Sequence, residues 1–564
     1  MKTEIANRIL ALRAEMKKAG VDAVIIPQTD PHQSEYLAAH WQVRRWLSGF
    51  TGSAGDLVVT ADDALLWTDS RYFLQAARQL EDTDIKLMKD GLPDTPSINH
   101  YLTHTLKKGA KVGIDGALFN LGTVCALRGV LEKRGMTLAT DFDATDTIWE
   151  DRPDLPEAMV FVHDVKYAGE TAASKIAKIL AEAAEQGANA TLVSALDEIA
   201  WTLNIRSRDV NCNPVATAFL YLSAKGSILF IKPEKIDDAT AAYLKEAGVS
   251  VLPYSEVYSH MSSLPADTLV LVDATRTSVK AIDSLGSRAV VGASPIPMLK
   301  ATKNDVQIAG IRKSMEIDGA ALVGAFMEIE KRMAEGTKLT EMDVADILTH
   351  FRSQQPGYFD LSFETIAGYG PHGAIVHYEA TPETDSTIEP HGLLLIDSGA
   401  QYLTGTTDIT RTIAMGAPTA EEKRDFTLVM KGHIALGTAI TASINSLVNS
   451  GYTVSSYGND VVYLNDVPQL NYYWPDAALY YNNGRLYGSQ FTYSSPYYDM
   501  NRYNTLYNTL MMQYGAPVQV VNNGPVCSAT WYGAGNRYVT LSFNSGYSGQ
   551  FYTCLLYTSD AADE

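Results

Sequence analysis

The sequence predicts a mixed α/β protein of several domains, and three observations support that prediction. The chain has 564 residues, which is too many for one hydrophobic core and suggests roughly three or four domains. Over the first 440 residues, helical patterns alternate with short apolar runs typical of buried strands. Beyond that point the runs alternate and are rich in Tyr, which indicates a β-rich segment.

The first domain is expected to begin with an amphipathic helix. Ile5, Ile9, Leu12 and Met16 share one helical face, charged residues occupy the opposite face, and Gly20 ends the pattern. A signal peptide would instead contain a continuous apolar stretch. Four strands are predicted next, the last of them before a helical stretch that runs to Glu132: VDAVIIP (21–27), DLVVT (56–60), ALLWTD (64–69) and KVGID (111–115).

A second α/β unit and a third domain follow. The second unit begins with a helical run from Thr171 to Gln186 and contains the strands SILFI (227–231) and TLVLVD (268–273). A long helix then starts at Asn304 or Asp305, and five residues mark its expected apolar face: Ile308, Ile311, Met315, Leu322 and Ile329. We therefore expect domains over residues 1–154, 155–302 and 303–440.

The composition changes abruptly near Ile440. Residues 441–564 contain 19 of the 31 Tyr, three Arg, no Lys and no His, whereas all eleven His lie earlier. Short alternating runs and one helix from Tyr503 to Tyr514 predict a β-rich module of a secreted type over residues 441–553. Residues 554–564, CLLYTSDAADE, resemble a translated sequencing adapter. A chimeric reading frame is our leading explanation, and a natural fusion is the alternative.

Charge and cysteine content exclude several classes of partner. With 45 basic and 65 acidic residues the net charge is -20, which repels phosphate backbones and anionic membranes and predicts neither a nucleic-acid nor a membrane partner. The four cysteines show neither metal-ligand spacing nor a CxxC pair. No apolar run reaches membrane-spanning length. Together with the amphipathic first helix, these features predict a cytoplasmic protein.

Asp397 and Asp408 are the main candidates for chemistry. They lie eleven positions apart in LLLIDSGAQYLTGTTDITRT (393–412), which is built from strand and turn residues. Because side chains alternate along strands, a tight turn within residues 402–405 would bring both carboxylates to one face of a hairpin. Paired carboxylates favour Mn, Mg or Ca, or Zn or Co if an imidazole is added. From spacing alone, the alternative is two solvated carboxylates or a pair with Arg411.

This stretch resembles the first metal-ligand motif of the pita-bread metallopeptidases, which include methionine aminopeptidase, prolidase, creatinase and Xaa-Pro aminopeptidase. The segments IDSGAQY and GTTDITRT are most similar to those of the Xaa-Pro aminopeptidases. Further stretches agree in the family's order: SEYLAAHWQVRRWLSGFTGSAG with LLWTDSRYFLQA, LDEIAWTLNIRSRDV, and TIAGYGPHGAIVHYEAT. The resemblance covers residues 1 to about 440 and implies two creatinase-N-like α/β domains followed by a pita-bread catalytic domain.

The resemblance implies a metal-dependent Xaa-Pro aminopeptidase, a homodimer that releases the N-terminal residue from peptides with proline second. Two divalent metal ions, usually manganese, would be held with Asp397 binding one and Asp408 bridging both. His377 would contact the substrate or intermediate and assist proton movement, and Arg71 would bind the peptide. From the residues alone, His377 is a core histidine on a strand AIVHY (374–378), and Arg71 is a surface residue in a salt bridge.

The ligands that complete the family's site are missing from this sequence. The family adds a His in an HGTGHG-like stretch, a second active-site His, and two Glu, one of them in an EPGYY-like segment. Matching sequence stops after KGHIALGTAI (431–440), no His follows, and the only later Glu is Glu564. His372, His391 and His433 correspond to no ligand position. We therefore expect an incomplete, inactive catalytic domain in which the two carboxylates repel and one has a raised pKa.

Two other interpretations remain. The first is a non-catalytic aminopeptidase-like body, kept for dimerisation or peptide binding and fused to the Tyr-rich module. The second is a creatine- or dipeptide-cleaving relative, which the additional N-terminal domain disfavours.

The composition break can be tested directly on nucleic acid. If the reading frame is chimeric, independent long reads across the codons for residues 439–445 will not reproduce the junction. A junction that recurs in every read would establish a natural fusion.

Overall fold

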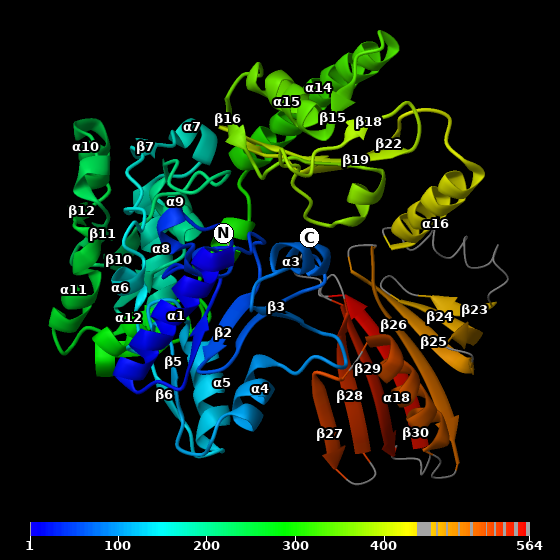
Figure 1. The fold of residues 1–564 in the computed structure, drawn as a ribbon, viewed down its shortest axis with the longest axis horizontal. Coiled ribbons are helices and arrows are strands. Elements are labelled where there is room, and N and C mark those ends of the chain that lie inside the picture. Colours follow the sequence, from blue (N-terminus) through cyan, green and yellow to red (C-terminus); the bar gives the residue numbers. More distant parts are fainter. Residues whose placement is uncertain are drawn as a thin grey trace. The chain divides into compact units, whose positions relative to one another are not determined.

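The computed structural model describes residues 2–436 without a gap, together with most of the C-terminal segment (Figure 1). The described C-terminal stretches are 453–457, 461–469, 472–482, 485–496, 500–514, 516–523, 526–533, 537–545 and 551–559. The chain forms two compact units, the first comprising residues 1–90 and 95–417 and the second comprising residues 91–94 and 418–564.

The first unit begins with a six-stranded sheet in the order β4-β3-β2-β1-β5-β6. Strand β1 pairs antiparallel with β2 and parallel with β5, so the sheet is mixed. The strands are β1 (Ala23–Ile26), β2 (Asp56–Thr60), β3 (Ala64–Thr68), β4 (Lys86–Lys89), β5 (Lys111–Gly113) and β6 (Thr137–Ala139). The helices are α1 (Lys2–Ala19), α2 (Val43–Ser48), α3 (Phe73–Gln79), α4 (Ile98–Thr105), α5 (Leu121–Glu132) and α6 (Thr145–Ile148). The four strands predicted here are confirmed.

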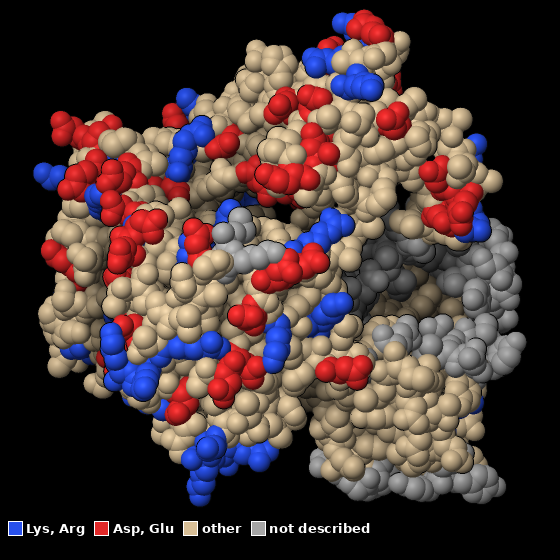
Figure 2. Space-filling model, in the orientation of Figure 1, with Lys and Arg blue, Asp and Glu red and all other residues tan. Residues whose placement is uncertain are grey.

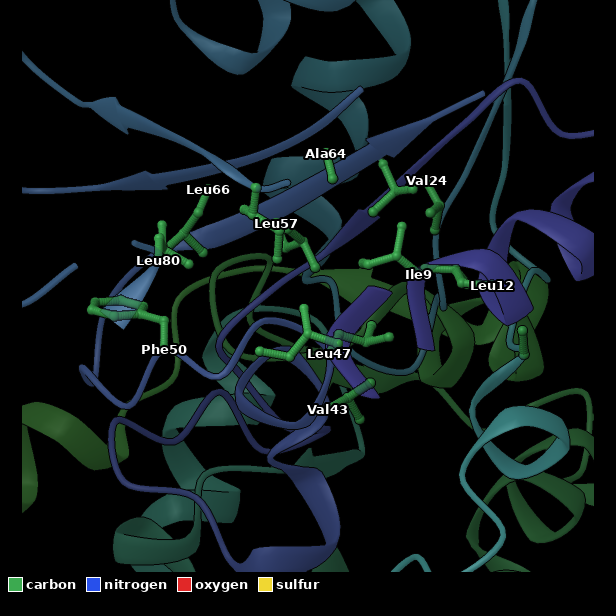
Figure 3. Close-up of a cluster of buried hydrophobic side chains, with 14 of the residues drawn as sticks. Ile9, Leu12, Val24, Val43, Leu47, Phe50, Leu57, Ala64, Leu66 and Leu80 are labelled. Atoms are coloured by element: carbon green, nitrogen blue, oxygen red, sulfur yellow. The ribbon is translucent and has the colours of Figure 1, made fainter. Parts of the chain in front are cut away.

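Both faces of this sheet are covered by apolar side chains. Leu57 and Leu66 face α1 and α2, where Ile9, Leu12 and Leu47 pack against them (Figure 3). Alternate residues of the same strands face a second core that includes α4 and α5. Each fully buried aliphatic side chain stabilises the fold by about 1.5–3 kcal/mol. The predicted apolar face of α1 is confirmed, because all four of its residues are at most 5% exposed.

The second sheet of the first unit repeats this arrangement, in the order β12-β11-β10-β8-β13-β14. As in the first sheet, the first strand in the chain, β8, pairs antiparallel with the next and parallel with a later one. The strands are β8 (Ala190–Val193), β10 (Phe219–Ser223), β11 (Ser227–Phe230), β12 (Val249–Leu252), β13 (Val270–Val272) and β14 (Ala289–Val291). The covering helices are α8 (Ala172–Glu185), α9 (Leu196–Leu203), α10 (Asp238–Glu246), α11 (Val257–Ser263), α12 (Val279–Leu285) and α13 (Ile296–Ala301).

The third part of the first unit begins with the predicted long helix α14 (Asp305–Ala334). Asn304 caps it, since its side chain accepts from Gln307 N while the Gln307 side chain accepts from Asn304 N. The predicted apolar face is only partly correct. Leu322 and Ile329 are buried, but Ile308 and Met315 are 39% and 42% exposed, because the core of this part packs only against the later turns of the helix.

Helix α15 (Glu341–Ser353) and short strands complete this part. They form the sheets β15-β18, β16-β20-β21 and β17-β19-β22. Their bounds are β15 (Leu339–Thr340), β16 (Tyr358–Leu361), β17 (Ile366–Tyr369), β18 (Thr387–Ile388), β19 (Leu393–Ser398), β20 (Ala400–Tyr402), β21 (Gly405–Thr406) and β22 (Ile409–Ala414).

The second unit contains helix α16 (Ala420–Leu436) and an eight-stranded antiparallel sheet in the order β23-β24-β25-β26-β30-β29-β28-β27. Helix α18 (Asn501–Tyr514) confirms the predicted helix and packs in a core with Trp474 and Trp531. The strands are β23 (Thr453–Tyr457), β24 (Val461–Gln469), β25 (Tyr472–Asn482), β26 (Arg485–Ser495), β27 (Gln519–Asn523), β28 (Val526–Gly533), β29 (Arg537–Ser545) and β30 (Phe551–Ser559). The β-rich prediction is confirmed for the described residues.

Charged side chains are unevenly distributed between the two units. Figure 2 shows both signs scattered over the first unit and few charged side chains over the sheet of the second. Within the described residues, no helix is both long and apolar enough to cross a membrane.

Candidate metal and peptide site

The two candidate aspartates lie on the two arms of one β-hairpin, Asp397 in β19 and Asp408 in the two-residue break between β21 and β22. Asp397 in β19 pairs with Thr410 in β22, and at the tip Tyr402 in β20 pairs with Gly405 in β21. Residues 403 and 404 form the two-residue loop. Asp408 lies two residues before Thr410, so its side chain is on the same face as Asp397 and diagonal to it. The predicted tight turn and shared face are therefore confirmed.

Asp397 has one carboxylate oxygen without a partner among the described residues, and Asp408 is affected by the charge of Asp397. Asp397 Oδ1 is shielded from solvent and has no hydrogen-bond partner within the described residues. Burial and, after it, the charge of Asp397 raise the pKa of Asp408. This confirms the expected raised pKa of one carboxylate. Arg411 does not neutralise the two carboxylates. It lies opposite Ile396, one position along from Asp397, and its side chain therefore projects from the opposite face of the hairpin.

The donors present do not make a complete site for two metal ions. A carboxylate oxygen without a partner, beside a second carboxylate, is suited to supply part of the coordination of a hard divalent cation. Yet in the part of the chain that the structure describes, no group of three His, Cys, Asp or Glu side chains is placed to hold a metal. Two carboxylates alone do not supply the coordination that a pair of metal ions needs.

His377 lies beside this hairpin and beside the first domain. Its Nδ1 is 2.6 Å from Tyr72 Oη, which in turn lies 2.7 Å from Ser53 Oγ. Burial and the charge of Arg71 lower the pKa of His377, and Asp397 is among the acidic groups that partly oppose this shift. The strand expected over residues 374–378 is wrong: His377 lies in a turn after the short helix η5 (Gly370–Ala374), because Tyr378 N donates to Ile375 O.

Arg71 forms a bidentate salt bridge with Asp69. Its Nε and Nη2 donate to the two carboxylate oxygens at 2.9 and 2.7 Å. The Arg71 side chain is 37% exposed, and its guanidinium carbon lies 5.3 Å from the centre of the Tyr72 ring. Arg71 is thus held in place by two neighbours in TDSRYF, Asp69 and Tyr72, while part of its side chain stays exposed.

A buried ion pair fixes the hairpin to the two helices. Arg352 in α15 and Asp318 in α14 are fully buried and form a bidentate pair at 2.8 and 3.0 Å. Tyr402 Oη donates to Asp318, and Arg352 also donates to Ser398 O, the residue after Asp397. Loss of one charge would leave the other buried and uncompensated, which typically costs about 3–5 kcal/mol.

A second buried carboxylate, Glu341 at the first position of α15, holds the loop that contains His377. His372 Nδ1 and Tyr378 Oη donate to it at 2.9 and 2.8 Å, and the backbone N–H groups of Tyr369 and Ser386 donate at 2.7 and 3.2 Å. The His372 ring also stacks on Tyr378, with centroids 4.4 Å apart. Two of these donors flank His377, so Glu341 sets the path of the chain on both sides of it.

Three family models match nearly the whole first unit. Residues 8–152 and 151–307 each match a creatinase/prolidase N-terminal domain, and residues 309–449 match metallopeptidase family M24. Among curated proteins the chain is similar to aminopeptidase P2 of Arabidopsis thaliana, with 40% identity over 75% of this chain and 64% of that relative. It is equally similar to a probable Xaa-Pro aminopeptidase P of Laccaria bicolor, with 40% identity over 80% of this chain and 70% of the relative.

A solved structure agrees with these matches. The X-prolyl aminopeptidase of Caenorhabditis elegans, described as a cytosolic enzyme with a di-nuclear active site, superposes with a TM-score of 0.73. The identity is 29%, and the match covers 87% of this chain and 88% of that one. The fold and site thus define a metallopeptidase with creatinase-type N-terminal domains. More particularly, the chain belongs to metallopeptidase family M24, with the proteins named Xaa-Pro aminopeptidase P.

Sequence reasoning missed the residues that support the site. Tyr72 stands next to Arg71, but its contact with His377 joins positions 305 residues apart. His372 corresponds to no ligand position of the family, yet it donates to Glu341, whose buried position the sequence does not reveal. The only available hint was Glu341 at the start of a helical pattern, where carboxylates commonly serve the helix itself.

Replacing Glu341 tests its structural role. Glu341→Gln keeps the side-chain volume but turns an amide N–H₂ toward groups that donate, so at least one buried donor loses its acceptor. We expect a loss of stability of about 1–3 kcal/mol for each such donor, measured by urea denaturation, and faster hydrogen exchange over residues 370–386. Glu328→Gln, which removes a partly exposed carboxylate that pairs with Arg332 on α14, is the matched control and should cost less than about 1 kcal/mol.

Replacing Asp408 tests the repulsion between the carboxylates. The folded-state pKa of Asp408 is raised, so ionisation of Asp408 opposes folding. This loss of stability is absent below the ordinary Asp pKa and develops as pH rises through the folded-state pKa. In EDTA, Asp408→Asn should therefore be more stable at pH 7, by less than about 1 kcal/mol because the group is exposed. The gain should disappear near pH 3 and shrink at high salt, whereas the exposed control Asp62→Asn should show neither effect.

Proposed function

We propose that the first unit derives from a metal-dependent Xaa-Pro aminopeptidase, which releases the N-terminal residue from peptides with proline second. The observation that supports this most strongly is the shared face of Asp397 and Asp408 on a hairpin of fixed register. His377 and Arg71 lie in the same neighbourhood, linked to Asp397 by the charges that act on His377. Relatives of 40% identity bear the name of this activity.

In that role the chain's own residues would bind and orient a peptide. The Arg71 guanidinium would donate two hydrogen bonds to a backbone carbonyl or a terminal carboxylate of the peptide. His377, whose Nδ1 is engaged by Tyr72, would present Nε2 to the substrate and hold or move a proton there. Its lowered pKa favours the neutral ring at pH 7, which can accept a proton.

Asp397 and Asp408 are the proposed metal ligands of this chain. With the ligands of the complete family site they would hold two divalent ions, manganese by our proposal, which would supply an activated water and charge stabilisation of an oxyanion. We propose that this chain is inactive, because its described residues supply two carboxylates and no third ligand side chain in reach. The orphaned Asp397 Oδ1 is consistent with a site from which other members are missing.

The division of the chain and its setting are part of the proposal. We assign residues 1–154 and 155–302 to two creatinase-like domains, 303–440 to the truncated catalytic domain, 441–553 to an unrelated β-rich segment and 554–564 to an adapter-derived tail. Residues 554–559 of that tail lie in strand β30, between β26 and β29, and residues 560–564 are outside the described residues. We further propose that the protein is a cytoplasmic homodimer whose partners are peptides with N-terminal Xaa-Pro.

One observation favours the alternative, a non-catalytic aminopeptidase-like body fused to a Tyr-rich module. The second unit has a core of its own, in which Trp474 and Trp531 are fully buried under helix α18. A sheet whose two halves pair at eight consecutive positions across β26 and β30 is what a genuine module would form. In that case the first unit would bind peptides or dimerise without cleaving them.

An assay on peptides with proline second separates these possibilities. The purified chain with added Mn²⁺ should release no N-terminal residue above the rate of a heat-inactivated sample. Peptide binding without cleavage, weakened at least about tenfold in Arg71→Gln, would support the non-catalytic alternative. Metal-dependent turnover that Asp408→Ala abolishes would contradict the proposed inactivity, since another part of the chain would then supply the missing ligands.

A further inference from the structure

A cavity of about 470 Å³ lies between the second domain and the tip of the hairpin, on residues that the proposed peptidase chemistry does not use. Its walls come from β7 (Phe161–Val162), α7 (Val165–Ala168), β9 (Ile205–Arg206), helices α9 and α13, the start of α14, and hairpin residues 401–406. In Figure 1, β7 and α7 lie beside β16 and α14. The volume is within the range of small-molecule sites, about 300–1,000 Å³.

The cavity has an excess of positive charge. Arg206, Lys300 and Lys303 line it, and the only carboxylate in its lining is Asp197, which forms an ion pair with Lys300. Three cations and one anion leave two positive charges. This is notable in a chain whose net charge is -20, and an excess of this kind attracts anions from solution.

Two of these cations, Arg206 and Lys303, are not neutralised by neighbouring acids of the described residues. Within the described residues, no carboxylate lies within 4.0 Å of Arg206 or Lys303, and Arg206 Nη1 donates instead to the carbonyls of Ala200 and Ile205. Burial lowers the pKa of Arg206 to about 10. Burial, followed by the charges of Arg206 and Lys175, lowers the pKa of His163 to about 4. His163 is therefore neutral at pH 7 and available as a hydrogen-bonding group.

Aromatic rings form the apolar part of the wall. Phe161 and Phe359, from the second domain and from β16, have centroids 5.4 Å apart, and both line the cavity with Trp201 and Tyr167. The Arg208 guanidinium covers the ring of Phe359 at 3.9 Å. A flat ring bound in the cavity can therefore stack on or pack edge-on against aromatic side chains, while an anionic group meets the cations.

We propose that this cavity binds a small phosphate monoester that carries a flat ring. Two excess positive charges match the charge of a phosphate monoester at pH 7, about −1.5 to −2, better than that of a single carboxylate. Lysine and arginine side chains are common phosphate ligands. The inference does not rest on the proposed peptidase function. The residues proposed for that function, Asp397, Asp408, His377 and Arg71, do not line the cavity.

Calorimetric titration of adenosine monophosphate into the full chain, in buffer with EDTA, tests the proposal. EDTA removes any metal ion that could bind the nucleotide at Asp397 and Asp408, so the result is independent of that site. We expect a dissociation constant of about 10 µM to 1 mM. Adenosine and inorganic phosphate, which each lack one half of the probe, should bind at least about tenfold more weakly.

Variants of Lys303 locate the binding. Lys303 is exposed at the mouth of the cavity, so Lys303→Gln should fold normally and weaken binding by about threefold to tenfold, and Lys303→Glu by more. Lys107→Gln removes the same charge from an exposed position of the first domain and should leave binding unchanged. Stacking should also quench Trp fluorescence, and Trp201→Phe should lose that part of the quenching.

Three results would overturn the proposal. The first is no binding of adenosine monophosphate up to about 5 mM. The second is equal affinity for adenosine and its monophosphate, which would show that the cations take no part. The third is unchanged affinity in both Lys303 variants when their circular dichroism matches that of the unmodified chain, which would place the binding elsewhere.

Discussion

The pairing of β19 with β22 is the constraint on which the site depends. Side chains alternate along a strand, so the register that places Asp397 opposite Thr410 also puts Asp408 on the same face. A shift of one residue in one strand would turn one carboxylate to the other face. Contacts with the two helices stabilise this register. In the buried Arg352–Asp318 pair, Asp318 accepts from Tyr402 at the tip, and Arg352 donates to Ser398 O beside Asp397. Two helices thus hold the two aspartates in place.

The rest of the site depends on parts of the chain that are distant in sequence. The first domain supplies Tyr72 to His377, and Glu341 on α15 holds the chain on both sides of that histidine. A duplicated sheet arrangement provides the first two domains, and the second of them forms one wall of the basic cavity whose other wall is the hairpin tip. Binding at the cavity would therefore involve the tip of the hairpin that carries the two aspartates nearer its middle.

Local sequence patterns correctly predicted the features of the fold that depend on neighbouring residues. The helix with Ile5, Ile9 and Leu12 on one face, the strands of the first sheet and the tight turn at 402–405 all follow from periodicity and turn geometry, and the structure confirms them. The sequence failed where tertiary contacts decide. The run AIVHY has strand character, but its His377 lies in a turn, because His372 before the run and Tyr378 at its end both donate to Glu341. Met315 fits an apolar stripe yet is exposed, since the hydrophobic core of this part packs on α14 from Leu322 onward.

The central claim is that this hairpin is one part of a two-metal site whose other ligands are missing from the described chain. Titration of Mn²⁺ into the metal-free chain, followed by dialysis and metal analysis, tests it most directly. The account predicts well under one tightly bound ion per chain, because two carboxylates leave most of the coordination of two ions to water. Two ions retained per chain, both lost in Asp408→Ala, would contradict it.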